Sequence, residues 1–283
     1  MYYGIVAVSV IMFGFQFFFS DRYEKENGNG FPAVYTLIFL SAIAGLVCLL
    51  PISAFKVGFT PFTLCCAAIV TLNTILCGLC TLKALARIDL AVFSLFSMLG
   101  GMVLPFLSGI IFYDERFTLG KVVCLVFVVA ALLLTVDKSG KRGGERYYVG
   151  VFILNGMSGV ISKFFESAPY PKTNAVSYSV WIAVVNLVVS GVALLLLRKK
   201  VNKPTGKAVL YGLGYGTLNR IANFPLVFAL AVLPASVQYP FLTGGVIVVS
   251  TVISAFVSGK PKPKAIISVI LAFVGIMSLV LLP

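Results

Sequence analysis

An arginine flanked by two asparagines interrupts the apolar stretch GYGTLNRIANFPLVF, which spans residues 214–228. A guanidinium carries a planar fork of N–H donors that matches a carboxylate or a phosphate, so Arg220 is suited to bind an anionic group. Asn219 and Asn223 are four residues apart and share one face of a helix, with Tyr215 one turn earlier. A helix here would present a cation, amide groups and an aromatic ring on one side.

A structural role for Arg220 is the alternative, because the guanidinium could pair with a carboxylate or with backbone carbonyls freed by Pro225. An arginine at the centre of a membrane-spanning helix costs about 2.5–3.5 kcal/mol on insertion scales, so a compensating contact is required. The nine acidic residues of the chain all fall at or near the ends of apolar runs, and none falls at the depth of Arg220. Their positions favour an anionic or zwitterionic solute, such as an organic acid or an amino acid, as the partner.

Other polar side chains deep within apolar runs complete the predicted binding set. Each has a more ordinary alternative role in hydrogen bonding between helices. Lys163 is a second candidate cation, for which an ion pair with Glu166, three residues further on, is the alternative. The remaining members of the set are Gln16, Asn73, Asn155, Gln238 and Tyr239.

The composition excludes a soluble enzyme. Of the 283 residues, 60% are hydrophobic and 11% are charged, whereas a soluble domain carries about 25% charged residues. The net charge of +13 resides in short segments between apolar runs, which favours membrane topology and lipid headgroups over nucleic acid as its cause. The chain has no histidine and no Walker A motif, so we expect no catalytic site, cofactor or metal. The expected partners are a small-molecule solute and the lipid bilayer, with the protein a monomer or a homodimer.

Ten apolar runs are each long enough for a membrane-spanning helix of about 20 residues. The prediction is therefore an all-α integral membrane protein with ten transmembrane helices. The short connections between the runs predict that helices adjacent in sequence lie side by side and antiparallel. The predicted helices are 2–20, 32–52, 61–83, 90–112, 118–136, 148–165, 174–197, 207–230, 235–258 and 264–282.

An internal repeat divides the chain into halves, residues 1–140 and 141–283. LAVFSLFSMLGG at 90–101 aligns with PASVQYPFLTGG at 234–245, so that both end in a pair of glycines. Upstream, the triplet Thr-Leu-Asn that ends at Asn73 recurs with its end at Asn219, and Gly4 matches Gly150. Each half would hold five helices, and because five is odd, the halves would cross the membrane in opposite directions. Such inverted repeats are typical of transporters, with the solute site between the halves.

The distribution of basic residues predicts the orientation. Most lysines and arginines fall in the segments that follow odd-numbered helices, from Arg22 to Lys264, so these segments are expected in the cytoplasm. Both termini would then lie outside, in a multi-pass protein of the plasma membrane.

Two stretches resemble the drug/metabolite transporter superfamily, EamA type. One runs from Ala91 through Pro105 to YDERFTLGKVVCLVFVVAALLL at 113–134, and the other is ASVQYPFLTGGVIVVSTVISAF at 235–256. The ten short helices in two halves resemble that superfamily as well. The resemblance implies a Glu-Arg pair at the end of the fourth helix and a glycine opening the fifth, matched by Glu115, Arg116 and Gly120.

The second copy departs from this pattern, with Ser-Gly-Lys at 258–260 where a Glu-Arg pair is usual. The resemblance also implies cytoplasmic termini, which the basic residues contradict. It implies transport of a small organic solute by alternating access, as export or exchange. The alternatives are a non-transporting membrane subunit or lipid-handling scaffold and, within transport, efflux of drugs or other cations.

Overall fold

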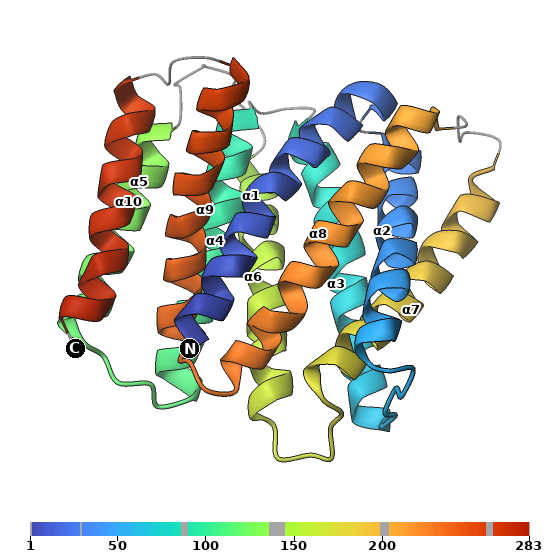
Figure 1. Ribbon diagram of the computed structural model, residues 1–283, viewed down its shortest axis with the longest axis horizontal. Helices are drawn as coiled ribbons and strands as arrows, with labels where there is room; N and C mark the ends of the chain where they lie inside the picture. The colour runs from blue at the N-terminus through green and yellow to red at the C-terminus, as the bar shows by residue number, and fades with distance from the viewer. Residues whose placement is uncertain are drawn as a thin grey trace.

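The computed structural model describes residues 2–28, 30–85, 90–135, 145–198, 204–258 and 263–282 (Figure 1). Within these ranges the chain forms ten α-helices and no β-strand. The helices are α1 (Tyr2–Asn27), α2 (Phe31–Ile52), α3 (Pro61–Leu85), α4 (Leu90–Phe112), α5 (Leu119–Thr135), α6 (Glu145–Ser167), α7 (Ala175–Leu196), α8 (Gly206–Leu230), α9 (Ala235–Ser258) and α10 (Pro263–Leu281).

The helix bounds follow the predicted apolar runs closely, except that α1 continues for a further seven residues to Asn27. This extension is held by Tyr23, which is buried and donates its hydroxyl to the backbone oxygen of Ala33 at 2.8 Å. Asn27 in turn donates its side-chain amide to the Tyr23 hydroxyl. Hydropathy predicts only the apolar part of a helix. It therefore misses a polar extension that is stabilised by contacts such as these.

Most helices have their main partners in the other half of the chain, and the prediction that sequence neighbours lie side by side was wrong for most of the bundle. The pairs α5–α10 and α2–α7 form opposite ends of the molecule in Figure 1, with the other helices between them. In that middle region α1 packs against α8 and α9, and α6 packs against α3 and α4. Small residues explain why these helices pack together, because helices in lipid associate where their backbones can approach closely.

Glycines make the contact between α4 and α6 especially close. A Cβ atom placed on Gly100 would lie 2.0 Å from the backbone oxygen of Phe152, and one on Gly156 would lie 2.4 Å from the oxygen of Gly100. The second glycine pair faces other helices, since Gly245 lies against Val10 of α1 and Gly244 against Ile276 of α10. The glycine pairs of the sequence are therefore packing positions, and Gly100, Gly101 and Gly245 face helices of the other half.

Four of the described helices, α2, α3, α6 and α7, contain a segment long and apolar enough to cross a membrane. Five further apolar segments of 10–17 residues lie in α1, α4, α5, α9 and α10. Large apolar side chains are also exposed on the outside of the bundle, including Val47 at 66% and Leu196 at 81%. These features are compatible with a protein surrounded by lipid.

Both chain ends lie on one side of the molecule, the lower side in Figure 1, together with the turns 113–118 and 231–234. We refer to it as the terminus side. Several basic residues that predict the orientation lie outside the described residues, namely Arg87, Lys138, Lys141, Arg142, Lys199, Lys200, Lys203, Lys260 and Lys262.

Candidate functional site

Arg220 lies well inside α8, fourteen residues after its first residue and ten before its last. Its aliphatic stem passes over Gly45 of α2, where a Cβ atom would lie 2.9 Å from Cγ of the arginine. The stem thus needs a glycine opposite it. The Nε atom is buried and has no hydrogen-bond partner among the described residues. A carboxylate partner, one of the two structural alternatives for this arginine, is absent from the part of the chain that the structure describes.

The polar residues around Arg220 join α8 to α1. Asn219 donates its side-chain amide to Oε1 of Gln16 at 3.1 Å, and Tyr215 hydrogen-bonds to the same glutamine. Asn223 is exposed and donates its side-chain amide to the backbone oxygen of Asn219 at 2.7 Å. The structure therefore brings Gln16, Tyr215 and Asn219 together between α1 and α8, and Tyr215 interacts electrostatically with Arg220. Gln16 is the member that sequence alone could not place there.

The other predicted polar residues form hydrogen bonds between helices, which is the alternative role expected for them. Asn73 of α3 donates to the backbone oxygen of Leu154 at 2.8 Å and to the Ser158 hydroxyl at 2.9 Å, both on α6. Asn155 of α6 donates to the backbone oxygen of Ser97 on α4. The same holds in α9, where Gln238 donates to the oxygen of Leu226 on α8 and Tyr239 to that of Gly159 on α6.

Lys163 makes its ion pair with a residue distant in sequence. Its Nζ atom lies 3.1 Å from Oε1 of Glu115, and the two side chains are 10% and 6% exposed. Glu166, the predicted partner, still interacts with this lysine electrostatically but makes no salt bridge with it in the described structure. The local spacing of three residues pointed to the wrong carboxylate, because the turn after α4 brings a better placed one to α6.

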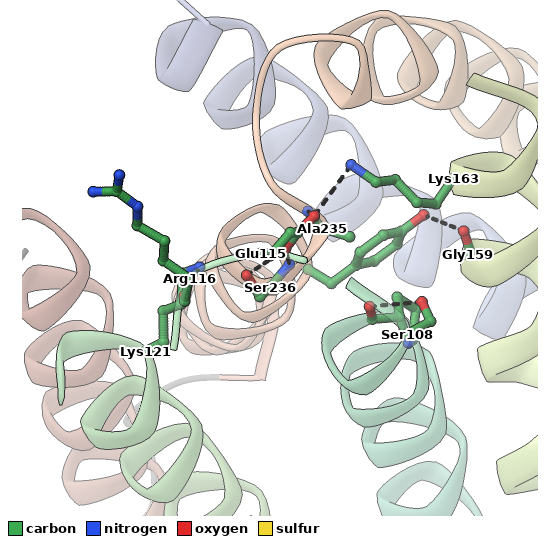
Figure 2. A network of polar contacts seen from close by, with 10 residues as sticks. Ser108, Glu115, Arg116, Lys121, Gly159, Lys163, Ala235 and Ser236 are labelled. Carbon is green, nitrogen blue, oxygen red and sulfur yellow. Dashed lines mark hydrogen bonds and ion pairs between the residues drawn. The ribbon is translucent and has the colours of Figure 1, made fainter. Parts of the chain in front are cut away.

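Glu115 is the centre of a buried polar cluster on the terminus side (Figure 2). One carboxylate oxygen accepts the backbone N–H of Ala235 at 2.7 Å, and the other accepts the N–H of Ser236 at 2.9 Å and its hydroxyl at 2.5 Å. These are the first two residues of α9, whose free N–H groups and dipole favour a negative charge. With Lys163, the carboxylate therefore has four donors.

The backbone of the α4–α5 turn aims Glu115 back over α4. Asp114 adopts a left-handed conformation with φ of 49°, and the N–H groups of Tyr113 and Glu115 both donate to the backbone oxygen of Gly109. A Cβ atom on Gly109 would lie only 2.5 Å from Oε2 of Glu115. Gly109 thus provides the space in which the carboxylate lies.

The charged form of Glu115 is stabilised in the folded protein. Burial raises the pKa of this carboxyl, but the hydrogen bonds from Ser236 and Ala235 and the Lys163 ammonium outweigh that effect and lower the pKa below 4.5. Since the folded-state pKa is below the unfolded one, the stabilisation is complete above about pH 4.5. It is lost as the pH falls through the folded-state pKa.

We expect Glu115→Gln to lower the unfolding free energy by about 3 kcal/mol at neutral pH, because it leaves Lys163 uncompensated and removes the charge at the start of α9. Asp114→Asn is the matched control, since it removes an exposed carboxylate next to Glu115 and suits the left-handed backbone. Thermal unfolding in detergent over a range of pH measures both. The deficit of Glu115→Gln should shrink below pH 4.5; a deficit that is equal at every pH would contradict this role of the charge.

Two open, apolar pockets lie on the terminus side. The larger, of about 510 Å³, is lined by residues of α3, α6 and the turn after α4, among them Cys66, Tyr113 and Phe164. The smaller, of about 360 Å³, lies between the segments 59–62 and 170–171. Arg220 lines neither pocket, and the described structure places its Nε in the protein interior.

The sequence alone assigns Glu115 no contact. Its partners at the start of α9 are more than a hundred residues away, so no periodicity could connect them. The sequence features that point to this cluster are Gly109, six residues before Glu115, and Pro234, which precedes the start of α9. Asn186 was also left out of the binding set, although it is buried in α7 and its Oδ1 atom has no partner among the described residues.

Comparisons with known proteins bear on the fold. No family model matches the chain, and no curated protein matches it. A solved structure described only as "Crystal structure of protein" has a TM-score of 0.77, with 14% sequence identity over 99% of this chain and 96% of that chain. At this level of identity the comparison shows that the chain adopts an experimentally known helical fold.

Proposed function

We propose that this protein is a membrane transporter that moves a small organic solute with an anionic group by alternating access. The observation that carries the proposal is Arg220, a cation inside a helical bundle whose Nε finds no partner among the described residues. A buried charge persists in a membrane helix when a function requires it, because an apolar residue would be less costly there. A carboxylate or phosphate arriving from solution would compensate this charge.

The helix neighbours support an inverted repeat. When each helix is exchanged with the one five positions away, α1–α8 becomes α6–α3, and α1–α9 becomes α6–α4. The pairs α2–α7, α5–α10 and α4–α9 map onto themselves. All these pairs are in contact, as a two-fold relation between residues 1–140 and 141–283 requires. The boundary between these halves lies outside the described residues.

Two aligned asparagines strengthen this relation. Asn73 of α3 and Asn219 of α8 correspond in the repeat, and each donates its side-chain amide to the first helix of the other half. For Asn73 that helix is α6, and for Asn219 it is α1. Transporters built in this way bind their solute between the halves, where Asn219 of α8 contacts Gln16 of α1.

The proposal includes ten membrane crossings, with both termini on the outer face of the plasma membrane. The shared side of the two chain ends is as expected for an even number of crossings. The resemblance to the drug/metabolite transporter superfamily, EamA type, supports the same architecture and function. Solute specificity would come from Arg220, because a cationic drug would be repelled by it while an organic acid, an amino acid carboxylate or a sugar phosphate would be attracted.

Reconstitution into liposomes tests the function. We expect protein-dependent uptake of at least one of radiolabelled glutamate, succinate and a hexose phosphate, in net flux or in exchange for the same unlabelled solute. A thermal-shift screen of the same classes in detergent would identify the bound solute first, since a ligand of the folded state raises its stability. A protein that moves none of these anions but moves a cationic dye would support drug efflux. Absence of any flux would favour a non-transporting subunit or lipid-handling scaffold.

A further inference from the structure

The cluster around Glu115 ties the two halves of the chain together at one end of the bundle. The carboxylate comes from the turn between α4 and α5, in the first half, whereas its four donors come from α6 and α9, in the second. Its own half provides the space above Gly109 and an electrostatic interaction with Lys121 of α5. Figure 2 shows Glu115 between Lys163 on one side and the start of α9 on the other.

The contacts of this cluster are polar and join helix ends, in contrast to the contacts deeper in the bundle. Between α4 and α6 the backbones touch at Gly100 and Gly156, where no side chain could be withdrawn to let them part. Hydrogen bonds to a carboxylate can be exchanged for bonds to water, so this end of the interface is the one suited to open reversibly.

The donors to Glu115 have other interaction partners when the cluster opens. The Nζ atom of Lys163 lies 5.4 Å from the centre of the Tyr113 ring, and Glu166 on the same helix interacts with it electrostatically. The first N–H groups of α9 are free of intrahelical partners in any conformation, so water can satisfy them once the carboxylate withdraws.

We propose that Glu115, Lys163 and the first residues of α9 form a gate that closes the terminus side of the solute pathway and opens in each transport cycle. This inference rests on the proposed transport function. It assigns to the described structure a conformation in which this gate is closed, with Glu115 as the residue that holds the two halves together. Opening moves the start of α9 away from the α4–α5 turn, and the carboxylate and the Lys163 ammonium become hydrated.

The test links the two sides of the gate reversibly. A variant carrying Glu115→Cys and Ser236→Cys is reconstituted, joined with a short bis-methanethiosulfonate linker, and assayed for uptake of the anion mixture used for the wild type. We expect the linked protein to lose uptake at least about tenfold and to regain it on reduction, because the cycle requires this end to open. The two single-cysteine variants and the wild type, treated with the same linker, are the controls for its reaction with the six native cysteines.

The outcomes separate the gate from the function on which it rests. Uptake that continues at full rate in the linked protein overturns the gate alone, whereas a wild type that transports no anion overturns both. Should the double variant fail to fold, hydrogen exchange of the wild type takes its place. The amides of Ala235 and Ser236 should then exchange faster during solute exchange than at rest, and equal rates would overturn the gate.

Discussion

Arg220→Met abolishes anion uptake and makes the protein more stable. Methionine fills much of the volume of the arginine stem over Gly45 without a charge that must be compensated. Because Nε has no hydrogen-bond partner and no salt bridge of Arg220 is seen among the described residues, the substitution removes a desolvation cost of up to about 3 kcal/mol. Loss of a buried charge contact with the solute costs about 2 kcal/mol or more, which corresponds to at least about a 30-fold loss of uptake at low solute concentration.

Loss of uptake together with a gain in stability identifies Arg220 as a binding residue. Replacement of an arginine with a structural role would instead lower the stability of the protein. Thermal unfolding in detergent and uptake by liposomes are measured on the same preparation. Arg198→Met is the matched control, because it makes the same replacement at an exposed arginine just after α7 and should leave both quantities unchanged. Arg220→Lys should retain part of the uptake, since lysine keeps the charge but lacks the planar fork. A destabilised Arg220→Met protein would indicate a structural partner for this side chain.

Gly100→Ala should destabilise the bundle by at least about 3 kcal/mol, because the added methyl group would lie 2.0 Å from the backbone oxygen of Phe152. A backbone atom cannot rotate away as a side chain does, so α4 and α6 must separate. Asn155 sits one turn from Phe152 on α6, and its bond to the oxygen of Ser97 would be lost with the separation.

Gly4→Ala provides the comparison for this substitution. It also replaces a glycine inside a helix, but nothing lies within 4 Å of its added Cβ atom. Helix propensity alone favours alanine by about 1 kcal/mol, so this variant should be as stable as the wild type or slightly more so. Thermal unfolding of both variants measures the difference. Equal stability of the two proteins would show that α4 and α6 are not packed through Gly100.

The helices could be predicted from the sequence because each is an apolar run bounded by polar residues, glycine or proline. In α7, for example, the predicted start coincides with Asn174, whose side chain caps the helix by accepting the N–H of Ser177. The packing partners could not be predicted in the same way. They depend on which small residues of distant helices meet, as Gly100 and Gly156 do, and hydropathy carries no such information.

The candidate site could be predicted only in part, because sequence spacing relates residues of one helix and not residues of distant helices. Residues of one helix, such as Asn219 and Arg220, could be grouped by spacing alone, and Gln16 joins them in the structure. Lys163 was assigned the nearest carboxylate in sequence, whereas the bundle supplies Glu115 from another helix end. Long-range ion pairs of this kind follow from the tertiary arrangement and from local backbone features such as the left-handed Asp114.

Equilibrium binding of the transported anion to purified wild type and Arg220→Met tests most directly whether this guanidinium receives the solute. Isothermal titration calorimetry in the same detergent is suited to both proteins. Wild-type protein should bind the anion, and Arg220→Met should bind it at least about 30-fold more weakly while remaining folded. Equal affinity of the two proteins would contradict the role assigned to Arg220 and would place the solute elsewhere in the bundle.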